Sequence, residues 1–332
     1  MATDRRSFLR FAGLVGFSAA TGAPASVGGL LSRASDERFF DWTEVARGVH
    51  VATGQGGNAL AARGLLVDCK NAPFGEVLGR EARALAGVID RVVNTHHHAD
   101  HTGGNHAFIK DVGVWSHENA HPRVVLQTDR YLSQIKQAVI DLERVDERKK
   151  ALIVEDWKRL HDRMSDLRAA DFTPAGKVVN DEEWDLSGTR VTFHHFGAGH
   201  TDNDIVVRMR SADVVHTGDL VFAGRHPFID TQGGGSVRGW EASLRRLREL
   251  CSPKTVVVPG HGDVGDAGLV ARQSAYFESL RRIVSRARDH DGMSRAEVVK
   301  LQTGAFEGLA GGEQALARNL GAMFDELADE AR

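Results

Sequence analysis

The hydrophobic residues of this chain follow two different spacings, and segments with each spacing alternate along the sequence. Short apolar runs bounded by glycine and polar residues predict strands. In the first half these runs fall at residues 49–53, 64–68, 91–94 and 112–115. Apolar positions at helical spacing predict a helix at residues 75–86 and the start of another at 103–109.

The second half returns to strands. Apolar runs predict strands at residues 190–196, 204–209, 214–216 and 255–258, and helical spacing predicts a helix at 239–250. Because strands alternate with helices in both halves, the expected fold class is α/β. The sequence shows no short-period repeat and no long low-complexity linker, so we expect one domain.

Two further segments have a helical pattern. Residues 118–170 are highly charged with apolar residues at helical spacing, and we expect a helical insert beside the functional site. Residues 267–332 are mostly helical, with a glycine-rich break at 308–312. We therefore expect a catalytic domain over residues 38–265 and a C-terminal helical extension, residues 266–332, packed on the same domain.

The composition is that of a soluble globular protein. Of 332 residues, 42% are hydrophobic and 26% are charged, and the formal net charge is -3. That balance provides no overall attraction to nucleic acid or to anionic lipid. The two cysteines, Cys69 and Cys251, cannot form a disulfide framework, and we interpret them as small, largely buried side chains.

The N-terminus has the pattern of an export signal. Residues 4–10 are basic, with paired arginines at Arg5 and Arg6, and a short apolar run and small residues up to Ala25 follow them. The start resembles a twin-arginine signal, although Asp4 stands where Ser or Thr is usual. We expect cleavage near Ala25, the twin-arginine export machinery as a partner, and a soluble periplasmic or secreted protein. A packed N-terminal helix is the alternative interpretation.

The densest chemical signal follows the strand predicted at residues 91–94. Four histidines and an aspartate stand within six positions: His96, His97, His98, Asp100 and His101. Imidazole and carboxylate together suit zinc and neighbouring transition metals. His96 and His98 can reach one ion from a loop, which leaves Asp100 and His101 for a second. In an extended loop His97 points away from this face, so it is left out of the ligand set; a solvated histidine loop is the alternative.

Three later motifs place potential ligands after strands. His200 lies in a glycine-rich turn after a strand, Asp219 ends another, and His261 stands between glycines after a third. In open α/β sheets, sites gather beyond the carboxyl ends of strands. Each motif alone fits a structural turn equally well, but together with the histidine run they predict a metal site.

In this order the motifs resemble the five-motif pattern of the metallo-β-lactamase superfamily, over roughly residues 40–265, with Asp68 as the first motif. The resemblance implies a four-layer αββα sandwich with the metals at one edge, between two similar halves. It implies two ligand groups, with His96, His98 and His200 on one ion and Asp100, His101 and His261 on the other. Asp219 would bridge the ions. Asp68 would support the metal loop without binding metal; an ordinary strand-end turn fits its sequence context equally well.

A pair of divalent ions, with zinc as the expected metal and iron or manganese as alternatives, can lower the pKa of a bridging water towards neutrality. The resulting hydroxide would be the nucleophile, and we find no Gly-x-Ser-x-Gly nucleophile motif. Asp100 is expected to orient the hydroxide and to move its proton, in addition to binding metal. The best-known β-lactamases of this superfamily have cysteine where Asp219 stands, so efficient β-lactam hydrolysis is not expected.

Neighbouring residues are candidates for secondary roles. Hydrogen bonds that fix the ligand rings are expected from among Thr102, Asn105, Thr201, Asp202 and Asp204, with helix caps and turns as competing roles. The substrate could be faced by Arg225, His226 and the glycines at residues 233–235, for which ordinary loop roles compete.

These features favour hydrolysis of a small ester, thioester, lactone or amide, and residues 218–230 are similar to exported hydrolases of that superfamily. The alternatives are a weak β-lactamase, a phosphodiesterase or nuclease, a mononuclear iron oxygenase, a diiron reductase and a non-catalytic metal-binding protein. The near-neutral charge and the absence of a basic, aromatic-rich patch in the sequence disfavour nucleic acid. A diiron reductase generally has Glu where His98 stands and needs a flavin domain. The oligomeric state is not readable from the sequence.

Overall fold

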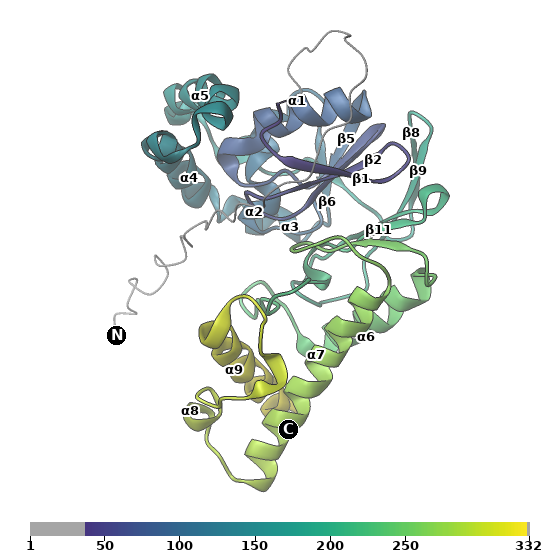
Figure 1. Ribbon diagram of the computed structural model, residues 1–332, viewed down its shortest axis with the longest axis vertical. Coiled ribbons are helices and arrows are strands. Elements are labelled where there is room, and N and C mark those ends of the chain that lie inside the picture. Colours follow the sequence, from purple (N-terminus) through teal and green to yellow (C-terminus); the bar gives the residue numbers. More distant parts are fainter. Residues whose placement is uncertain (1–36, 331–332) are drawn as a thin grey trace, which may run out of the picture. The chain divides into compact units, whose positions relative to one another are not determined.

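The structure, a computed structural model, describes residues 37–330, so the expected export signal at residues 1–25 lies outside the described residues. Within the described unit, two β-sheets lie at the centre and helices cover the outer face of each (Figure 1). This arrangement confirms both the expected α/β class and the four-layer αββα sandwich.

The first sheet has the strand order β1-β2-β3-β4-β5-β6-β7. Its strands are β1 Asp41–Ala46, β2 Val49–Thr53, β3 Ala59–Ala62, β4 Gly64–Val67, β5 Ile89–Val93, β6 Val114–Ser116 and β7 Gly176–Lys177. β1 to β4 pair antiparallel, whereas β4 to β7 pair parallel. Because β4, β5 and β6 run in one direction, the loops that follow them leave the same edge of the sheet.

The second sheet has the strand order β12-β11-β10-β9-β8. Its strands are β8 Glu183–Leu186, β9 Thr189–His194, β10 Val206–Met209, β11 Val214–His216 and β12 Val256–Val258. β11 and β12 pair parallel, and the other neighbours pair antiparallel. The apolar pattern did not single out β8, because this edge strand buries only Leu186 fully and so has no apolar run.

Alternation along the strands divides their apolar side chains between two faces. In β2, Val49 and Val51 join a core between the sheets that includes Val207 and Val214 of the second sheet. Ala52 belongs to a separate core on the outer face of the first sheet. The helices over that face are α1 Gly75–Ala86, α4 Thr128–Asp141 and α5 Glu147–Asp162. The outer face of the second sheet is covered by α6 Val237–Leu250, α7 Gly268–Ser285 and α9 Gly312–Glu330.

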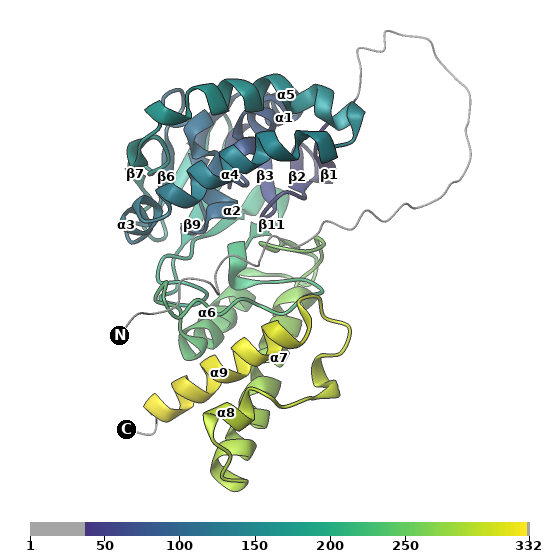
Figure 2. The same ribbon diagram turned by 90° about the vertical axis from the view of Figure 1, so that its left-hand side faces the viewer.

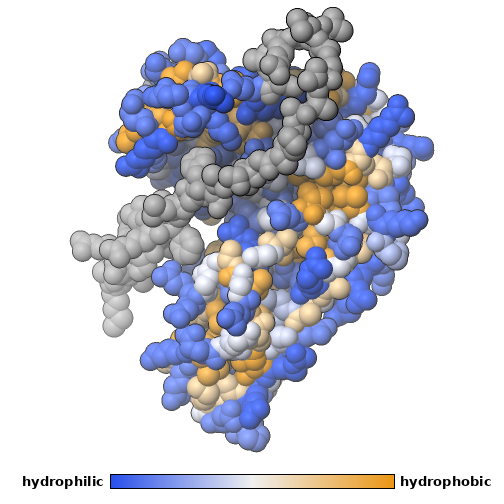
Figure 3. Space-filling view, in the orientation of Figure 1, coloured by the Kyte–Doolittle hydropathy of each residue, from blue (hydrophilic) through white to orange (hydrophobic). Residues whose placement is uncertain are grey.

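The two segments predicted to be helical differ in where they lie. Residues 118–170 form α3 Ala120–Val125, α4 and α5, next to the histidine-rich loop. The tail forms α7, α8 Arg295–Val298 and α9, on the side of the second sheet (Figure 2). On the face drawn in Figure 3, apolar side chains gather in separate areas among hydrophilic ones, one of them over these C-terminal helices. None of the helices in the described residues is long and apolar enough to cross a membrane.

The helix start expected at residues 103–109 is a short turn instead. One turn of α-helix, α2 Ala99–Thr102, runs into a 3₁₀ turn at Gly103–Ala107. The glycines explain the tight geometry, because Cβ atoms at Gly103 and Gly104 would collide with the backbone of Ala72 and Cys69. The segment is therefore packed against the loop after β4, which holds the histidine run in place.

Candidate metal centre

The histidine-rich loop leaves β5 at the edge where the parallel strands end, and a pair of buried amides holds it. Asn94 Nδ2 donates to the His101 carbonyl at 3.2 Å and to Asn105 Oδ1 at 3.0 Å. Asn105 Nδ2 donates back to Asn94 Oδ1 at 2.8 Å and to the Phe172 carbonyl at 2.8 Å. The start and the end of the loop are thus tied to each other and to the rest of the fold.

The structure brings four of the seven predicted ligands together in a first group. It contains His96, His98, His200 and Asp219, whose ligand atoms all lie within 4.8 Å of one another. Nδ1 of His98 lies 3.0 Å from Nε2 of His200, and that nitrogen lies 3.5 Å from Oδ2 of Asp219. These residues come from the loops after β5, β9 and β11, so three chain segments meet at this point.

A second group adjoins the first. It contains Asp100, His101 and His261, and their ligand atoms also lie within 4.8 Å of one another. Nε2 of His261 is 3.2 Å from Oδ2 of Asp100. Asp219 contacts this group as well, with Oδ1 3.2 Å from His101 Nε2 and Oδ2 3.5 Å from His261 Nε2. Its carboxylate therefore lies between the two groups, as a bridging ligand must.

The hydrogen bonds of the ligand rings fix which nitrogen carries the proton. The Nδ1 proton of His101 is donated to Asp68 at 2.8 Å, and the Nδ1 proton of His200 to the Phe228 carbonyl at 2.7 Å. In His98 the other nitrogen is used, because Nε2 donates to Asp230 at 2.8 Å. In its neutral form, each of these three rings therefore presents a lone pair, on its remaining nitrogen, to the centre.

His96 follows the same scheme through a hydroxyl. Asp68 accepts from both the backbone N–H and the hydroxyl of Thr95, each at 2.8 Å. The hydroxyl proton is committed to Asp68, so the Thr95 oxygen accepts from Nδ1 of His96 at 3.0 Å. Asp68 thus orients the loop and two ligand rings, His101 directly and His96 through Thr95, which is the supporting role that the resemblance implies.

The donor set fits divalent metal ions. Among the predicted ligands, three buried atoms have no hydrogen-bond partner in the described residues: His96 Nε2, His101 Nε2 and Asp219 Oδ1. Buried polar atoms without partners are costly. When both rings are neutral with the tautomers above, the lone pairs of His98 Nδ1 and His200 Nε2, 3.0 Å apart, also repel each other. A cation between these atoms removes both costs. Nitrogen and carboxylate ligands in this number suit zinc and similar ions.

The protonation states suit the same role. Burial lowers the pKa of His200 to about 3, so its imidazole is neutral. Burial alone would raise the pKa of Asp219, but His261 and His101 beside it hold that pKa well below its usual range. Neutral imidazole and ionised carboxylate are the forms that bind metal. Against the effect of burial, Asp219 raises the pKa of His101 and, together with Asp100, that of His261 to about 9, so a cation binds in the second group by displacing the protons of these rings.

The site has a buried floor and a more open rim. The side chains of His101 and His200 are inaccessible and that of Asp219 is 4% exposed, whereas Asp100 is 25% exposed. His98 and His261 are also partly accessible. A substrate would therefore approach along Asp100, His98 and His261.

Sequence reasoning missed Asp230 and the Phe228 carbonyl, which hold two of the ligand rings. Both belong to a loop without strand or helical periodicity, and a backbone carbonyl has no signature in the sequence. His97, left out of the ligand set, lies outside both main groups; its ring contacts Asn203, and its Nε2 is 3.7 Å from Asp230.

The expectation that five neighbouring polar residues fix the ligand rings is wrong. Their side chains bond to backbone groups or to side chains other than the ligand rings, in Thr102, Asn105, Thr201, Asp202 and Asp204. They brace loops: the Thr102 hydroxyl lies 2.7 Å from the Tyr131 hydroxyl of α4, and Arg123 of α3 pairs with Asp202. Short polar side chains in turns bond to nearby backbone, which is the competing role the sequence allowed.

Of the residues expected to face the substrate, His226 does not. It is buried, and its Nδ1 lies 2.8 Å from the Tyr276 hydroxyl of α7. The glycines at residues 233–235 allow close packing, because a Cβ at Gly235 would collide with the His200 carbonyl. Arg225 is exposed on the same loop.

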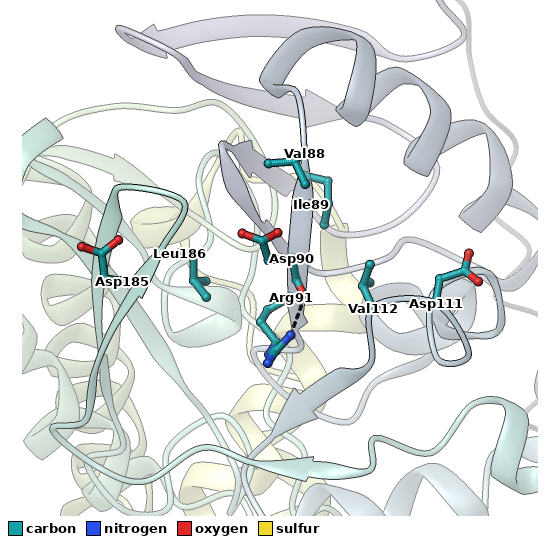
Figure 4. Close-up of a pocket in the computed structure, with 8 residues that line it drawn as sticks. All are labelled: Val88, Ile89, Asp90, Arg91, Asp111, Val112, Asp185 and Leu186. Carbon is teal, nitrogen blue, oxygen red and sulfur yellow. Dashed lines mark hydrogen bonds between the residues drawn. The ribbon is translucent and has the colours of Figure 1, made fainter.

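Two surface hollows lie away from this centre. The larger, about 590 Å³, is lined by Val88, Asp90 and Arg91 at the start of β5 and by Asp185 at the β8 end (Figure 4). The ligands follow the opposite, carboxyl end of β5, so this hollow is not where the metal site opens. The other lies between α1 and α5, around Glu76 and Arg163.

Comparisons with known proteins agree with this geometry. A family model described as the metallo-beta-lactamase superfamily matches residues 64–261. A metallo-beta-lactamase type 2 from Bacillus sp. (strain 170) is 29% identical over 97 residues, which cover 29% of this chain and 38% of that protein. The probable metallo-hydrolase YqjP of Bacillus subtilis (strain 168) is 28% identical over 187 residues, covering 53% of this chain and 54% of that protein. The chain therefore spans less than two thirds of the length of these curated relatives.

A solved structure has the same fold. The metallo-beta-lactamase from Pontibacter korlensis superimposes with a TM-score of 0.52 at 20% identity, over 72% of this chain and 99% of that one. The matched family segment, residues 64–261, begins at β4 and ends at His261, so it contains all seven predicted ligands.

Proposed function

This chain belongs to the metallo-beta-lactamase superfamily, and from that membership we propose that it is a metal-dependent hydrolase of a small ester, thioester, lactone or amide. The observation that supports it best is the position of Asp219, whose carboxylate lies within 3.5 Å of ring nitrogens from both ligand groups. Two divalent ions, with zinc as the expected metal, would be held by these groups and share that carboxylate.

When bound, two divalent ions supply Lewis acidity that polarises a carbonyl and lowers the pKa of water. The chain's own residues account for the rest. Asp100 is the more accessible of the two carboxylates, and its Oδ2 is 3.2 Å from His261 Nε2, so it can hold a water in position and accept its proton at the rim. Asp219 is too buried to do so and serves as a ligand.

The first experiment is a substrate panel with the metal-loaded chain. Chromogenic ester, thioester, lactone, amide, β-lactam and phosphodiester substrates are compared in the wild type, in Asp219→Asn and in Asp90→Asn, a carboxylate at the opposite end of β5. We expect hydrolysis of at least one acyl substrate, lost in Asp219→Asn and retained in Asp90→Asn. Turnover of the phosphodiester alone, or activity that survives Asp219→Asn, would overturn the proposal.

We also propose that the chain is exported by the twin-arginine machinery and acts as a periplasmic or secreted protein. The support is the paired Arg5 and Arg6 before a short apolar run. Replacing both arginines with lysine should leave the uncleaved precursor inside the cell, whereas the wild type is processed near Ala25. Equal export of the two chains would contradict this proposal.

A further inference from the structure

The loop after Asp219 places an aromatic ring beside the open rim of the metal centre. The Phe228 carbonyl accepts a hydrogen bond from His200 Nδ1. The centroid of the Phe228 ring lies 5.7 Å from the centroid of the His98 ring. The side chain is 38% exposed although it is large and apolar. A substrate that reaches the rim at His98 therefore has Phe228 as its neighbour.

Helix α9 of the C-terminal segment places a cation over this ring. The Arg318 guanidinium carbon lies 4.5 Å from the Phe228 ring centroid. One terminal N–H donates to the Pro227 carbonyl at 3.3 Å, and Asn319 Nδ2 donates to the same carbonyl at 2.9 Å. The packing of α9 against α7 and α6 (Figure 2) fixes this position from a segment beyond the matched family region.

Arg318 has no carboxylate partner among the described residues. Other partly buried arginines of the unit do have one: Arg123 pairs with Asp202 at 2.5 Å, and Arg281 with Glu241 at 2.9 Å. Within the described residues, the one hydrogen bond of the Arg318 side chain is to the Pro227 carbonyl, and its Nε is buried without a partner. Burial lowers the pKa of this guanidinium, since no anion offsets the desolvation. It remains charged, and unpaired half-buried charges are uncommon unless they meet a ligand.

We propose that Arg318 and Phe228 form a subsite for a carboxylate of the substrate. This carboxylate would stand at the end of the acyl chain opposite the bond that is cleaved. A guanidinium offers a planar fork that matches a carboxylate, and Phe228 supplies apolar contact for the carbon chain between carboxylate and rim. The inference rests on the proposed function and narrows it: the substrate is an anionic acyl compound rather than a neutral one.

The test uses two esters that differ in one group. Mono-4-nitrophenyl adipate carries a free carboxylate, and 4-nitrophenyl adipamate carries a neutral amide in its place. We expect the wild type to prefer the carboxylate ester by about ten- to hundredfold in kcat/KM, mostly through a lower KM. This factor corresponds to the free energy of one charge-assisted hydrogen-bonded pair. Arg318→Met should remove the preference and leave the neutral ester within about twofold, and Arg318→Lys should keep part of it.

A matched control separates a local contact from net charge. Arg248→Met removes the same charge from the exposed end of α6 and should retain the full preference. Thermal unfolding and metal content are compared in every variant, and Arg318→Gln replaces Arg318→Met if the latter does not fold. A wild type without preference, or a preference that survives both Arg318→Met and Arg318→Gln, would overturn the subsite.

A binding measurement keeps the subsite testable if neither ester is cleaved. The corresponding ethers, 6-(4-nitrophenoxy)hexanoate and its amide, cannot be hydrolysed, and calorimetry gives their affinities. Tighter binding of the carboxylate by at least about tenfold, lost in Arg318→Met, supports the subsite even if the hydrolase proposal fails. Equal affinities of the two ethers in the wild type would refute the subsite while leaving the hydrolase proposal intact.

Discussion

The segment that the family model matches and the helical segment after it contribute to the metal centre in different ways. Residues 64–261 supply every predicted ligand and the Asp68 that orients His101. Residues 268–330 supply no ligand among the described residues, but they hold the loop that carries Phe228 and Asp230, through Asn319 and through Tyr276 on His226. The comparison suggests that the chemistry belongs to the shared core, whereas the added helices shape what reaches it.

The strongest way to break this comparison is to remove the second segment. Ending the chain after Asp266 should prevent folding, because Phe277, Leu280, Leu320 and Met323 are fully buried against the second sheet and α6. Each such side chain contributes about 1.5–3 kcal/mol, and exposing their partners removes much of a typical stability of about 5–15 kcal/mol. Circular dichroism and thermal unfolding measure the result. A truncated chain that unfolds cooperatively and hydrolyses the same substrates would show that the C-terminal segment is needed neither for folding nor for activity.

Acid should lower the free energy of unfolding through His106 of the first segment, which lies in the 3₁₀ turn that follows the histidine-rich loop. Its Nε2 donates to the Ala72 carbonyl at 2.7 Å, and burial lowers its pKa to about 4. Between about 6.5, the unfolded value, and 4, the unfolded chain binds a proton that the folded chain does not. The free energy of unfolding should therefore fall as the pH falls through this window, by about 3 kcal/mol in total.

Denaturant unfolding of metal-free wild type and His106→Gln at pH 7 and pH 4.5 isolates this contribution, because other groups titrate in both chains. The variant should lose less stability on acidification. Parallel losses in the two chains would show that His106 does not titrate as its burial requires.

Two carboxylates that accept hydrogen bonds from ligand rings allow the two segments to be compared directly. Asp68 lies in the core and accepts from His101, whereas Asp230 lies in the loop held by the C-terminal helices and accepts from His98. Replacing either with Asn should weaken zinc binding about 10- to 100-fold, because the ring loses its charged partner. Competition with a chromophoric chelator gives the affinities, with Asp90→Asn as the control. An Asp230→Asn chain with unchanged affinity would mean that the loop does not support the centre.

The smallest expected effect concerns the anchor of α6. Glu326 of α9 accepts from the Ser236 hydroxyl at 2.8 Å and from the backbone N–H groups of Val237 and Arg238, each at 2.7 Å. Glu326→Gln should lower the free energy of unfolding by about 1–2 kcal/mol, since the helix N-terminus loses a negative partner. Zinc affinity should stay within about threefold; a larger drop would show that the segment tunes the ligands themselves.

Much of the fold and most of the site could be predicted because the relevant signals are local. His96 to His101 stand together after a strand, and the three later ligands each follow an apolar strand, so the α/β rule places them at one edge. The roles of Phe228, Asp230 and Arg318 could not be predicted. A carbonyl has no residue signature, a loop has no period, and Arg318 reaches the site only through the packing of α9.

The seven-ligand, two-ion centre is tested most directly by anomalous scattering from a crystal of the full chain loaded with zinc. We predict two anomalous peaks, one among His96, His98 and His200 and the other among Asp100, His101 and His261, with the Asp219 carboxylate between them. A single peak, or peaks elsewhere in the described chain, would contradict the account.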